Sequence, residues 1–440
     1  MINRTILAVL RLPLCIAVVA AVCPAAQPLF RVISSLSGYQ QPGGLIEGSS
    51  PSVFYSEASV AGAATQLAFS VTTQGSTTTL ASFQANIESL LVSGSNGRFY
   101  SSVQPRGQLV TPFSVTSAPG SQQVYSAQTF ASSFSQNLPD GSLLGGAGWN
   151  AIDYVITCSL DGVVTPVYQF PPNQVLLSPV IYGNDGNYYG VEADTSDPAG
   201  YAYRVTPSGA LTPLYSFPGG TFRGNFTLPL LQASDGNLYG ATVAGGANGF
   251  GSVYKLTLEG QYTLLHSFPE GKSAGGPTTL IEASDGNLYG TAQAGSGYGE
   301  IFRITKSGQY STVYRMTNGP DGFCPCWLLQ GSDGLIYGIA HAGGSVGAGS
   351  FFSLDLGLPK PKPRAQHFHP QSGAAGTRVR IWGSNLLSAA VDFNGVPATE
   401  VSNSGPNYVW AIVPSGAASG PLSITTPGGT ITTRASFTVE

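Results

Sequence analysis

The feature that most constrains this chain is a segment that recurs along most of its length. Its clearest copies are LLQASDGNLYGATVAGGANGFGSVY at residues 230–254 and LIEASDGNLYGTAQAGSGYGEIF at residues 280–302. Seven copies align on one position, with successive spacings of 45, 44, 45, 50, 50 and 48 residues. Repetition at this period indicates an array of supersecondary units, each packing on its neighbours. The aligned positions are Tyr55, Tyr100, Leu144, Tyr189, Tyr239, Tyr289 and Tyr337.

Each copy carries four strand-like runs. In the fifth copy they are residues 230–233, 238–242, 252–257 and 262–268. The turn between the first two contains Asp235-Gly236, a dipeptide that favours a type I′ hairpin turn. A four-stranded antiparallel unit repeated every 40–50 residues is typical of a β-propeller blade, and a solenoid is less favoured.

The ends of the repeat array predict that it closes into a ring. The seventh copy supplies three strands, at residues 327–330, 336–341 and 350–354, and then runs into a proline-rich segment. Residues 30–36 have the pattern of the missing fourth strand. We therefore predict an all-β chain whose residues 27–356 form a seven-bladed β-propeller closed by the N-terminal strand. Closure would remove the sheet edges that an open array exposes.

The periodicity changes after the propeller. Residues 357–366 contain three prolines and are expected to form a stiff linker. Residues 367–440 contain short strand-like runs separated by turn residues, which favours a small immunoglobulin-like β-sandwich.

The N-terminal residues 1–26 have the pattern of a secretory signal peptide: Arg4, an apolar run from Leu12 to Val22, and small residues at Ala25 and Ala26. Arg11 and Pro13 interrupt the apolar run, so export is favoured over a membrane anchor. We expect a secreted, extracellular or cell-surface protein without a membrane span in the mature chain. Only 9% of residues are charged and the formal charge is −4, which argues against a nucleic-acid partner.

Three cysteines, Cys158, Cys324 and Cys326, remain after the expected cleavage. The Cys324-Pro325-Cys326 segment is compatible with a local disulfide, half of a metal site, or two unconnected thiols. No His or Cys pair stands nearby in the sequence to complete a zinc site, so a disulfide or no role is favoured over metal.

The pattern SDGNLYG, followed by a glycine-rich stretch and by GSVYKL and YTLLHSF, resembles the GloVer-type extracellular tandem repeats of bacteria. The resemblance covers about residues 30–356 and implies secreted proteins of mostly unassigned function. The tail resembles an IPT/TIG immunoglobulin-like domain at Phe368, Gly376-Thr377, residues 393–396 and Pro427-Gly428-Gly429, among other positions. That second resemblance implies a spacer or an interaction module.

The repeated turn aspartates Asp185, Asp235, Asp285 and Asp333 are interpreted as structural, because a short polar side chain before glycine bonds to its own turn. The tyrosine column and His266 are interpreted as core packing. Binding residues are expected where the longer loops gather, on the face opposite the tight turns. The candidates there are Glu192, Asp194, Asp197, Arg223, Asn225, Glu270, Lys272, Tyr298, Glu300, Asp321, Trp327 and His341.

Aromatic rings together with amide and carboxylate groups suit carbohydrate recognition. Calcium held by Glu192, Asp194 and Asp197, or simply solvated loop acids, are the alternatives. We expect a monomeric, non-catalytic binding or scaffold protein for an extracellular glycan or surface protein, with no cofactor, no metal and no catalytic residues. The alternative is a carbohydrate-active lyase or hydrolase that uses loop carboxylates at the propeller mouth.

Overall fold

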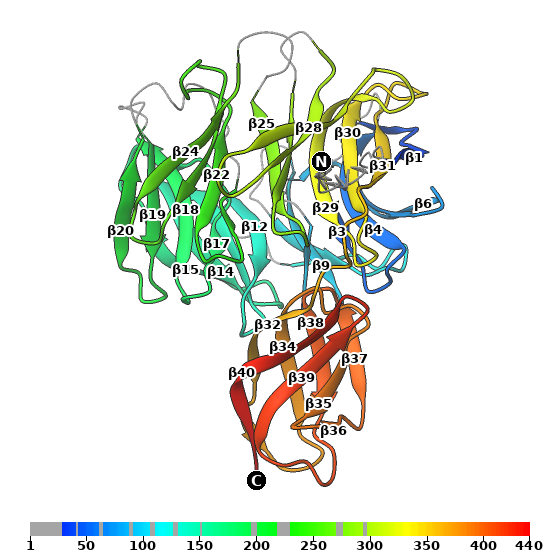
Figure 1. The fold of residues 1–440 in the computed structure, drawn as a ribbon, viewed down its shortest axis with the longest axis vertical. Helices are drawn as coiled ribbons and strands as arrows, with labels where there is room; N and C mark the ends of the chain where they lie inside the picture. Colours follow the sequence, from blue (N-terminus) through cyan, green and yellow to red (C-terminus); the bar gives the residue numbers. More distant parts are fainter. Residues whose placement is uncertain are drawn as a thin grey trace, which may run out of the picture.

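The protein is described by a computed structural model that covers residues 29–40, 43–60, 65–87, 91–105, 111–125, 131–149, 152–194, 200–217, 229–269, 276–293 and 297–440. Within these ranges every regular element is a strand. The expected signal peptide, residues 1–26, lies outside the described residues. Figure 1 shows the repeat sheets grouped together at one end of the molecule and a smaller C-terminal unit at the other.

The described part of residues 29–355 forms seven antiparallel sheets, here numbered in chain order. Sheets 1 to 3 contain β2 (Tyr39–Gln40), β3 (Ile46–Glu47), β4 (Val53–Val60), β5 (Gln66–Thr72) and β6 (Thr77–Phe83); β7 (Ala85–Ile87), β8 (Val92–Ser93), β9 (Phe99–Pro105), β10 (Thr111–Val115) and β11 (Gln123–Val124); and β12 (Ala131–Asn137), β13 (Leu143–Trp149), β14 (Ile152–Cys158) and β15 (Val164–Gln169).

Sheets 4 to 7 follow the same order. They contain β16 (Gln174–Leu176), β17 (Ile181–Tyr182), β18 (Tyr188–Asp194), β19 (Gly200–Val205) and β20 (Leu211–Ser216); β21 (Leu231–Gln232), β22 (Leu238–Thr242), β23 (Ser252–Leu256) and β24 (Tyr262–Ser267); β25 (Pro277–Glu282), β26 (Leu288–Ala292), β27 (Glu300–Ile304) and β28 (Tyr310–Arg315); and β29 (Phe323–Gln330), β30 (Ile336–Ala342) and β31 (Ser350–Asp355), joined by β1 (Leu29–Ser35).

The sheets are arranged as the repeat pattern predicts. The four strands expected in the fifth copy are present, and the first strands of neighbouring sheets contact one another, as β21 does with β25 and β25 with β29. Even the drifted third copy keeps its register, because Leu144 pairs with Thr157 as Tyr239 pairs with Lys255. The chain therefore has a repeat, β-propeller-like all-β fold.

The turn between the first two strands of the repeat, β21 and β22 in sheet 5, is not the type I′ turn that the Asp-Gly dipeptide predicts. In sheet 5 the Gly236 amide donates to the Ala233 carbonyl at 2.9 Å, and Gly236 alone has a positive φ, +84°. This is a type I turn followed by a left-handed glycine. Asp235 has a negative φ, and its carboxylate accepts hydrogen bonds from the residues that follow it.

The turn aspartate holds both its own loop and the tyrosine of the repeat. Asp235 accepts the Asn237 amide at 3.2 Å and the Tyr239 hydroxyl at 2.8 Å. Burial alone would raise the pKa of Asp235, but the hydrogen bonds from Asn237 and Tyr239 outweigh it and lower that pKa. The same tyrosine-to-aspartate bond recurs at Asp185, Asp285 and Asp333. The structural interpretation of these aspartates is confirmed.

Each of these turns is also bonded to the next sheet. An amide of the turn donates to a Gln or Glu side chain at the end of the neighbouring first strand. The pairs are Asn184 with Gln232 at 2.7 Å, Ser234 with Glu282 at 2.8 Å, Ser284 with Gln330 at 2.8 Å, and Ser332 with Glu47 at 3.1 Å. The last pair joins sheet 7 to sheet 1 across 285 residues, so the bond that links neighbours along the array also links its two ends.

The N-terminal strand completes sheet 7. β1 pairs antiparallel with β31, from Leu29 opposite Asp355 to Ser35 opposite Ser350. Aromatic contacts between the outer strands continue through this junction. Tyr215 stacks on Tyr262 at 4.5 Å, His266 on Tyr310 at 4.0 Å, and Tyr314 on Phe30 at 4.0 Å. His266 thus occupies an aromatic packing position, and burial lowers its pKa, which favours the neutral ring.

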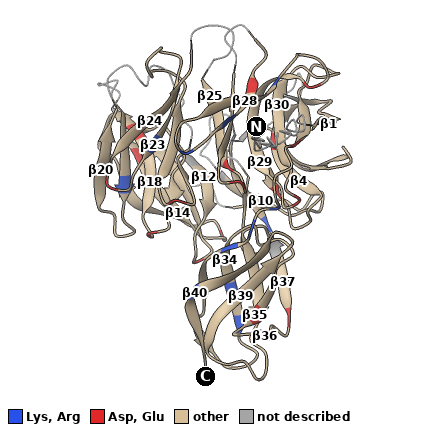
Figure 2. Ribbon diagram, in the orientation of Figure 1, with Lys and Arg blue, Asp and Glu red and all other residues tan. Residues whose placement is uncertain are grey.

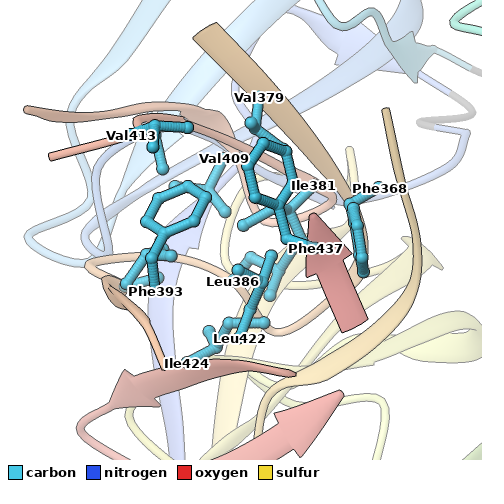
Figure 3. Close-up of a cluster of buried hydrophobic side chains, with 13 residues drawn as sticks. Phe368, Val379, Ile381, Leu386, Phe393, Val409, Val413, Leu422, Ile424 and Phe437 are labelled. Carbon is cyan, nitrogen blue, oxygen red and sulfur yellow. The ribbon is translucent and has the colours of Figure 1, made fainter. Parts of the chain in front are cut away.

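Residues 364–440, the C-terminal unit, form two sheets around one apolar core (Figure 3). One sheet contains β32 (Arg364–His369), β34 (Arg378–Ser384), β38 (Tyr408–Ile412) and β37 (Val401–Gly405), and the other contains β33 (Ser372–Gly373), β40 (Gly429–Val439), β39 (Gly420–Thr426), β35 (Ala390–Phe393) and β36 (Val396–Pro397). β32 begins three residues inside the expected linker, because Arg364 and Ala365 pair with Ser384 and Gly383.

The C-terminal unit is docked on the tight-turn side of the repeat sheets (Figure 1). Tyr408 donates its hydroxyl to the Leu138 carbonyl at 3.1 Å, and Arg380 donates to the Pro139 carbonyl at 2.7 Å. Further bonds join Trp410 to Ser95, Gln366 to Asn184, and Ser284 to Pro359. The C-terminal unit therefore covers part of the tight-turn side, and the long connections lie on the opposite side.

Replacing Glu47 by Gln should change how stability depends on pH. Burial raises the pKa of Glu47 to about 7, against the hydrogen bonds from Ser332. The folded state therefore keeps a proton that the unfolded chain releases, and stability falls as pH rises from about 4.5 to about 7. Gln, which already stands at positions 232 and 330, keeps an acceptor without this titration. We expect Glu47→Gln to raise stability at pH 8 by roughly 2–3 kcal/mol, measured by denaturant unfolding.

The control is Glu47→Ala, which removes the acceptor as well as the titration and should be about 1–3 kcal/mol less stable than Glu47→Gln at every pH. Part of the pH slope should persist in Glu47→Gln, because burial also raises the pKa of Glu57 to about 7. An unchanged slope between pH 4.5 and 7 in Glu47→Gln would contradict the assignment.

Loosening the docked unit should expand the molecule. The double variant Arg380→Gln, Tyr408→Phe removes two hydrogen bonds to buried carbonyls, at about 1–3 kcal/mol each. We expect a larger radius of gyration in small-angle X-ray scattering, with secondary structure retained by circular dichroism. Arg434→Gln, an exposed change in the same unit, should scatter like the wild type. Identical scattering from all three proteins would show that these bonds do not hold the units together.

Candidate functional site

The longer connections of the repeat sheets gather on the side away from the C-terminal unit, here called the loop face (Figure 1). Asp194 is described only in its backbone, as the last residue of β18. The predicted residues Asp197, Arg223, Asn225, Glu270 and Lys272 lie outside the described residues.

Glu300 begins β27 in sheet 6 and is 3% exposed. Its carboxylate accepts the Tyr310 hydroxyl at 2.5 Å and the Thr312 hydroxyl at 3.0 Å, both from the outer strand β28. Arg315 adds an ion pair at 3.6 Å from a largely exposed position. Glu300 therefore joins two strands of its own sheet and is not presented to a ligand in solution.

Asp321, predicted on the same face, is 4% exposed and stabilises the connection that precedes β29. It accepts the Thr317 amide at 2.8 Å, the Thr317 hydroxyl at 2.7 Å and the Gly319 amide at 3.0 Å. Tyr314 adds its hydroxyl at 3.1 Å. Four donors surround this one carboxylate, so its role is to fix the loop.

Glu192 lies on β18 and is 5% exposed. It sits among tyrosines between sheets 3 and 4. Burial raises the pKa of Tyr203, and the nearby carboxylates Glu192 and Asp153 raise it further. Asp153 itself accepts the Leu176 amide at 2.7 Å, and burial raises its pKa. Glu192 lies in sheet 4 and Glu300 lies in sheet 6. The structure therefore does not bring these two predicted glutamates together as a pair.

Among the predicted residues whose side chains are described, Tyr298 is the most exposed to solvent. Its side chain is 46% exposed, and its carbonyl accepts the Cys324 amide at 2.9 Å. The ring lies 6.3 Å from that of Phe323, at an angle of 56°. The connection of sheet 6 is thus bonded to the start of sheet 7, which holds an exposed aromatic ring in a fixed place.

Trp327 and His341 are only partly accessible. Trp327 packs against the core shared by sheets 7 and 1. His341 lies at the end of β30, where burial lowers its pKa and favours the neutral ring. Its Nε2 atom has no hydrogen-bond partner among the described residues. Among the described residues, the ring of Tyr298 contacts that of Phe323. Trp327 and His341 therefore do not extend the aromatic surface at Tyr298.

Two buried acids of sheet 1, Glu47 and Glu57, were not among the candidates from the sequence. Glu57, on β4 of sheet 1, is 7% exposed, and its Oε1 accepts the Gly44 amide at 2.8 Å. Burial raises its pKa to about 7, against hydrogen bonds from the amides of Gly44 and Leu91. Later copies have Ala241 or Thr291 at this position. An acid in place of a small residue was the available signal, and the drift of the first copy concealed it.

The three cysteines are free thiols, so the local disulfide considered for Cys324 and Cys326 does not form in this structure. Cys324 has a positive φ of +55°, and Cys326 is buried beside the core of sheets 7 and 1. Burial raises the pKa of both thiols. At neutral pH they are therefore protonated and weak nucleophiles.

Within the described ranges, no group of three or more His, Cys, Asp and Glu side chains is placed to hold a metal ion. The calcium alternative cannot be placed on these residues, since Asp197 lies outside them. No described segment forms a helix with the length and apolar character needed to cross a bilayer.

Comparison with known families assigns the repeat. Residues 177–391 match the Gloeobacter/Verrucomicrobia repeat, which confirms the resemblance for that part of the chain. The match extends past the last repeat sheet into the C-terminal unit. No curated protein matches the sequence.

Solved structures with related architecture are only distantly similar. A fungal alcohol oxidase of the AA5 family, in complex with copper, is 12% identical, with a TM-score of 0.46 over 91% of this chain and 99% of that one. An oligogalacturonate lyase in complex with manganese is 11% identical, with a TM-score of 0.45 over 86% and 99%. A protein from Lactobacillus plantarum is 13% identical, with a TM-score of 0.44 over 82% and 95%. Similarity at this level carries no argument about activity or ligand.

Proposed function

We propose that this chain is a secreted binding or scaffold protein: a closed, seven-bladed β-propeller that presents a ligand site on its loop face, followed by an IPT/TIG immunoglobulin-like domain. The observation that carries the proposal is the exposed ring of Tyr298, fixed beside Phe323 on that face. A rigid exposed aromatic ring stacks on the apolar face of a sugar at little entropic cost.

The surrounding acids support binding more than hydrolysis. A glycosidase needs two carboxyl groups that face each other across the substrate. Glu300 and Asp321 are each nearly buried and surrounded by donors from their own sheet or loop. The ligand class that fits best is therefore an extracellular glycan, with a surface protein as the second possibility, and we expect the protein to act as a monomer.

The docked C-terminal unit supports the same arrangement. It covers part of the tight-turn side through bonds such as Tyr408 to Leu138 and Arg380 to Pro139. The loop face lies on the side of the repeat sheets away from this unit (Figure 1). A fixed second domain would hold the binding face in a set orientation relative to whatever the C-terminal end contacts.

The binding role predicts a specific loss in Tyr298→Ala. Removing a stacked ring should weaken binding about tenfold, because aromatic contacts contribute about 1–3 kcal/mol. Tyr298→Phe keeps the ring and should stay within about threefold of the wild type. Neutral polysaccharides are first screened by affinity electrophoresis. Affinity is then measured by calorimetry with those that retard the wild-type protein in the gel.

The matched control is Leu264→Ala, which removes another exposed apolar side chain from the outer strand β24. Its affinity should be unchanged. If Tyr298→Ala bound as tightly as the wild type, the site would not be at this ring. If the wild type released soluble sugars during the screen, the protein would be an enzyme and the non-catalytic proposal would fail.

Export is tested separately. The proposed signal peptide ends at Ala26, so the mature chain should begin at Gln27. Expression of the full chain in a bacterium, followed by N-terminal sequencing of the secreted or periplasmic protein, should give Gln27 as the first residue. Uncleaved protein that remains in the membrane fraction would favour an anchor instead.

A further inference from the structure

A groove runs along the junction between the repeat sheets and the C-terminal unit. It consists of two cavities, of about 470 and 270 Å³, that share Asn184, Arg364 and Gln366 as lining residues. Its walls come from β12, β17, β21 and the turns at Asn184 and Ser234 on one side, and from β32, β34 and β40 on the other. It lies on the tight-turn side and is separate from the Tyr298 site.

The charge of this groove has one sign. Arg364, Arg434 and His367 line it, and none of its lining residues carries a carboxylate. Burial, His369 and Arg380 lower the pKa of His367, so the two arginines supply the charge at neutral pH. The whole chain has a formal charge of −4 and few charged residues (Figure 2), so a carboxylate-free lining with two arginines is a local departure.

One of the arginines is partly neutralised and the other is not. Arg364 lies 3.6 Å from Glu282, which also binds Lys306 at 2.6 Å. Arg434 is an exposed residue of β40 and forms no ion pair with any described residue. Arg434 is therefore the cation most available to an anionic ligand.

The remaining lining is rich in amide side chains. Asn184, Gln366, Gln371 and Asn407 line the two cavities, and each amide offers both a donor and an acceptor. Gln366 donates to Asn184 at 2.6 Å, which fixes both amides across the junction. Because the two units contribute opposite walls and are bonded together, the groove is preformed.

We propose that this groove binds an extended acidic polysaccharide, with uronate carboxylates at the arginines and sugar hydroxyls at the amides. Neighbouring hydroxyls both donate and accept, which matches fixed amides. Two neighbouring cavities that share Asn184, Arg364 and Gln366 suit a chain of several sugars more than a single small anion. The site is distinct from the loop face and does not depend on the function proposed there.

The test uses the full protein and alginate, a polyuronate, in calcium-free buffer, with dextran as the neutral counterpart. We expect alginate binding in calorimetry, weakened by added salt, and no dextran binding in the groove. Arg434→Gln should lower the affinity for alginate about tenfold, the loss expected for one charge-assisted hydrogen bond. Lys362→Gln, which removes a charge from the segment before β32 and outside the groove lining, should stay within twofold.

Three outcomes would overturn the proposal. Equal affinity of wild type and Arg434→Gln for alginate would exclude the groove. Binding of poly-glutamate as tight as that of alginate, with the same dependence on Arg434, would assign the groove to acidic peptides. Loss of alginate binding in Tyr298→Ala, with Arg434→Gln unaffected, would move the ligand to the loop face and would leave the proposed binding function standing.

Discussion

One hydrogen bond recurs at four junctions of the repeat sheets: a turn amide of one sheet donates to the Gln or Glu that ends the first strand of the next. It ties each of sheets 4 to 7 to the sheet that follows it. Since Ser332 and Glu47 form it across the two ends of the chain, it also closes the array. The turn side chains remain available: Asn184 accepts from Gln366 of the C-terminal unit, and Ser284 donates to the Pro359 carbonyl in the segment that leads to that unit.

Much of the fold could be predicted because the repeat keeps its register. Strand β22 begins and ends where the pattern placed it, and Leu144 occupies the tyrosine position although its side chain differs. The errors have local physical causes. The turn type was wrong because the Asp235 carboxylate binds Asn237 and Tyr239, which an Asp-Gly dipeptide does not reveal. Arg364 was assigned to a linker because its strand partner, Ser384, is distant in sequence.

The candidate site was less predictable than the fold. Glu300 and Tyr298 stand two residues apart, yet one is buried under Tyr310 and the other is exposed, and nothing in the loop sequence distinguishes them. Whether a loop acid is free depends on donors from other strands, such as Thr317 for Asp321. Glu57 shows the opposite case, a buried carboxyl in a drifted copy. The groove could not have been foreseen, because it exists only where two separately predicted units meet.

The position of β1 has a consequence for the order in which the protein can form. Its first residue, Leu29, pairs with Asp355, so the N-terminal strand has no partner until nearly the whole repeat array has been synthesised. Local hairpins can form as each copy emerges from the ribosome, whereas the last edge waits for the most distant contact in the array. A chain interrupted before residue 350 would keep sheet 7 incomplete and β1 unpaired. Completion of sheet 7 thus reports that translation has reached the end of the repeats.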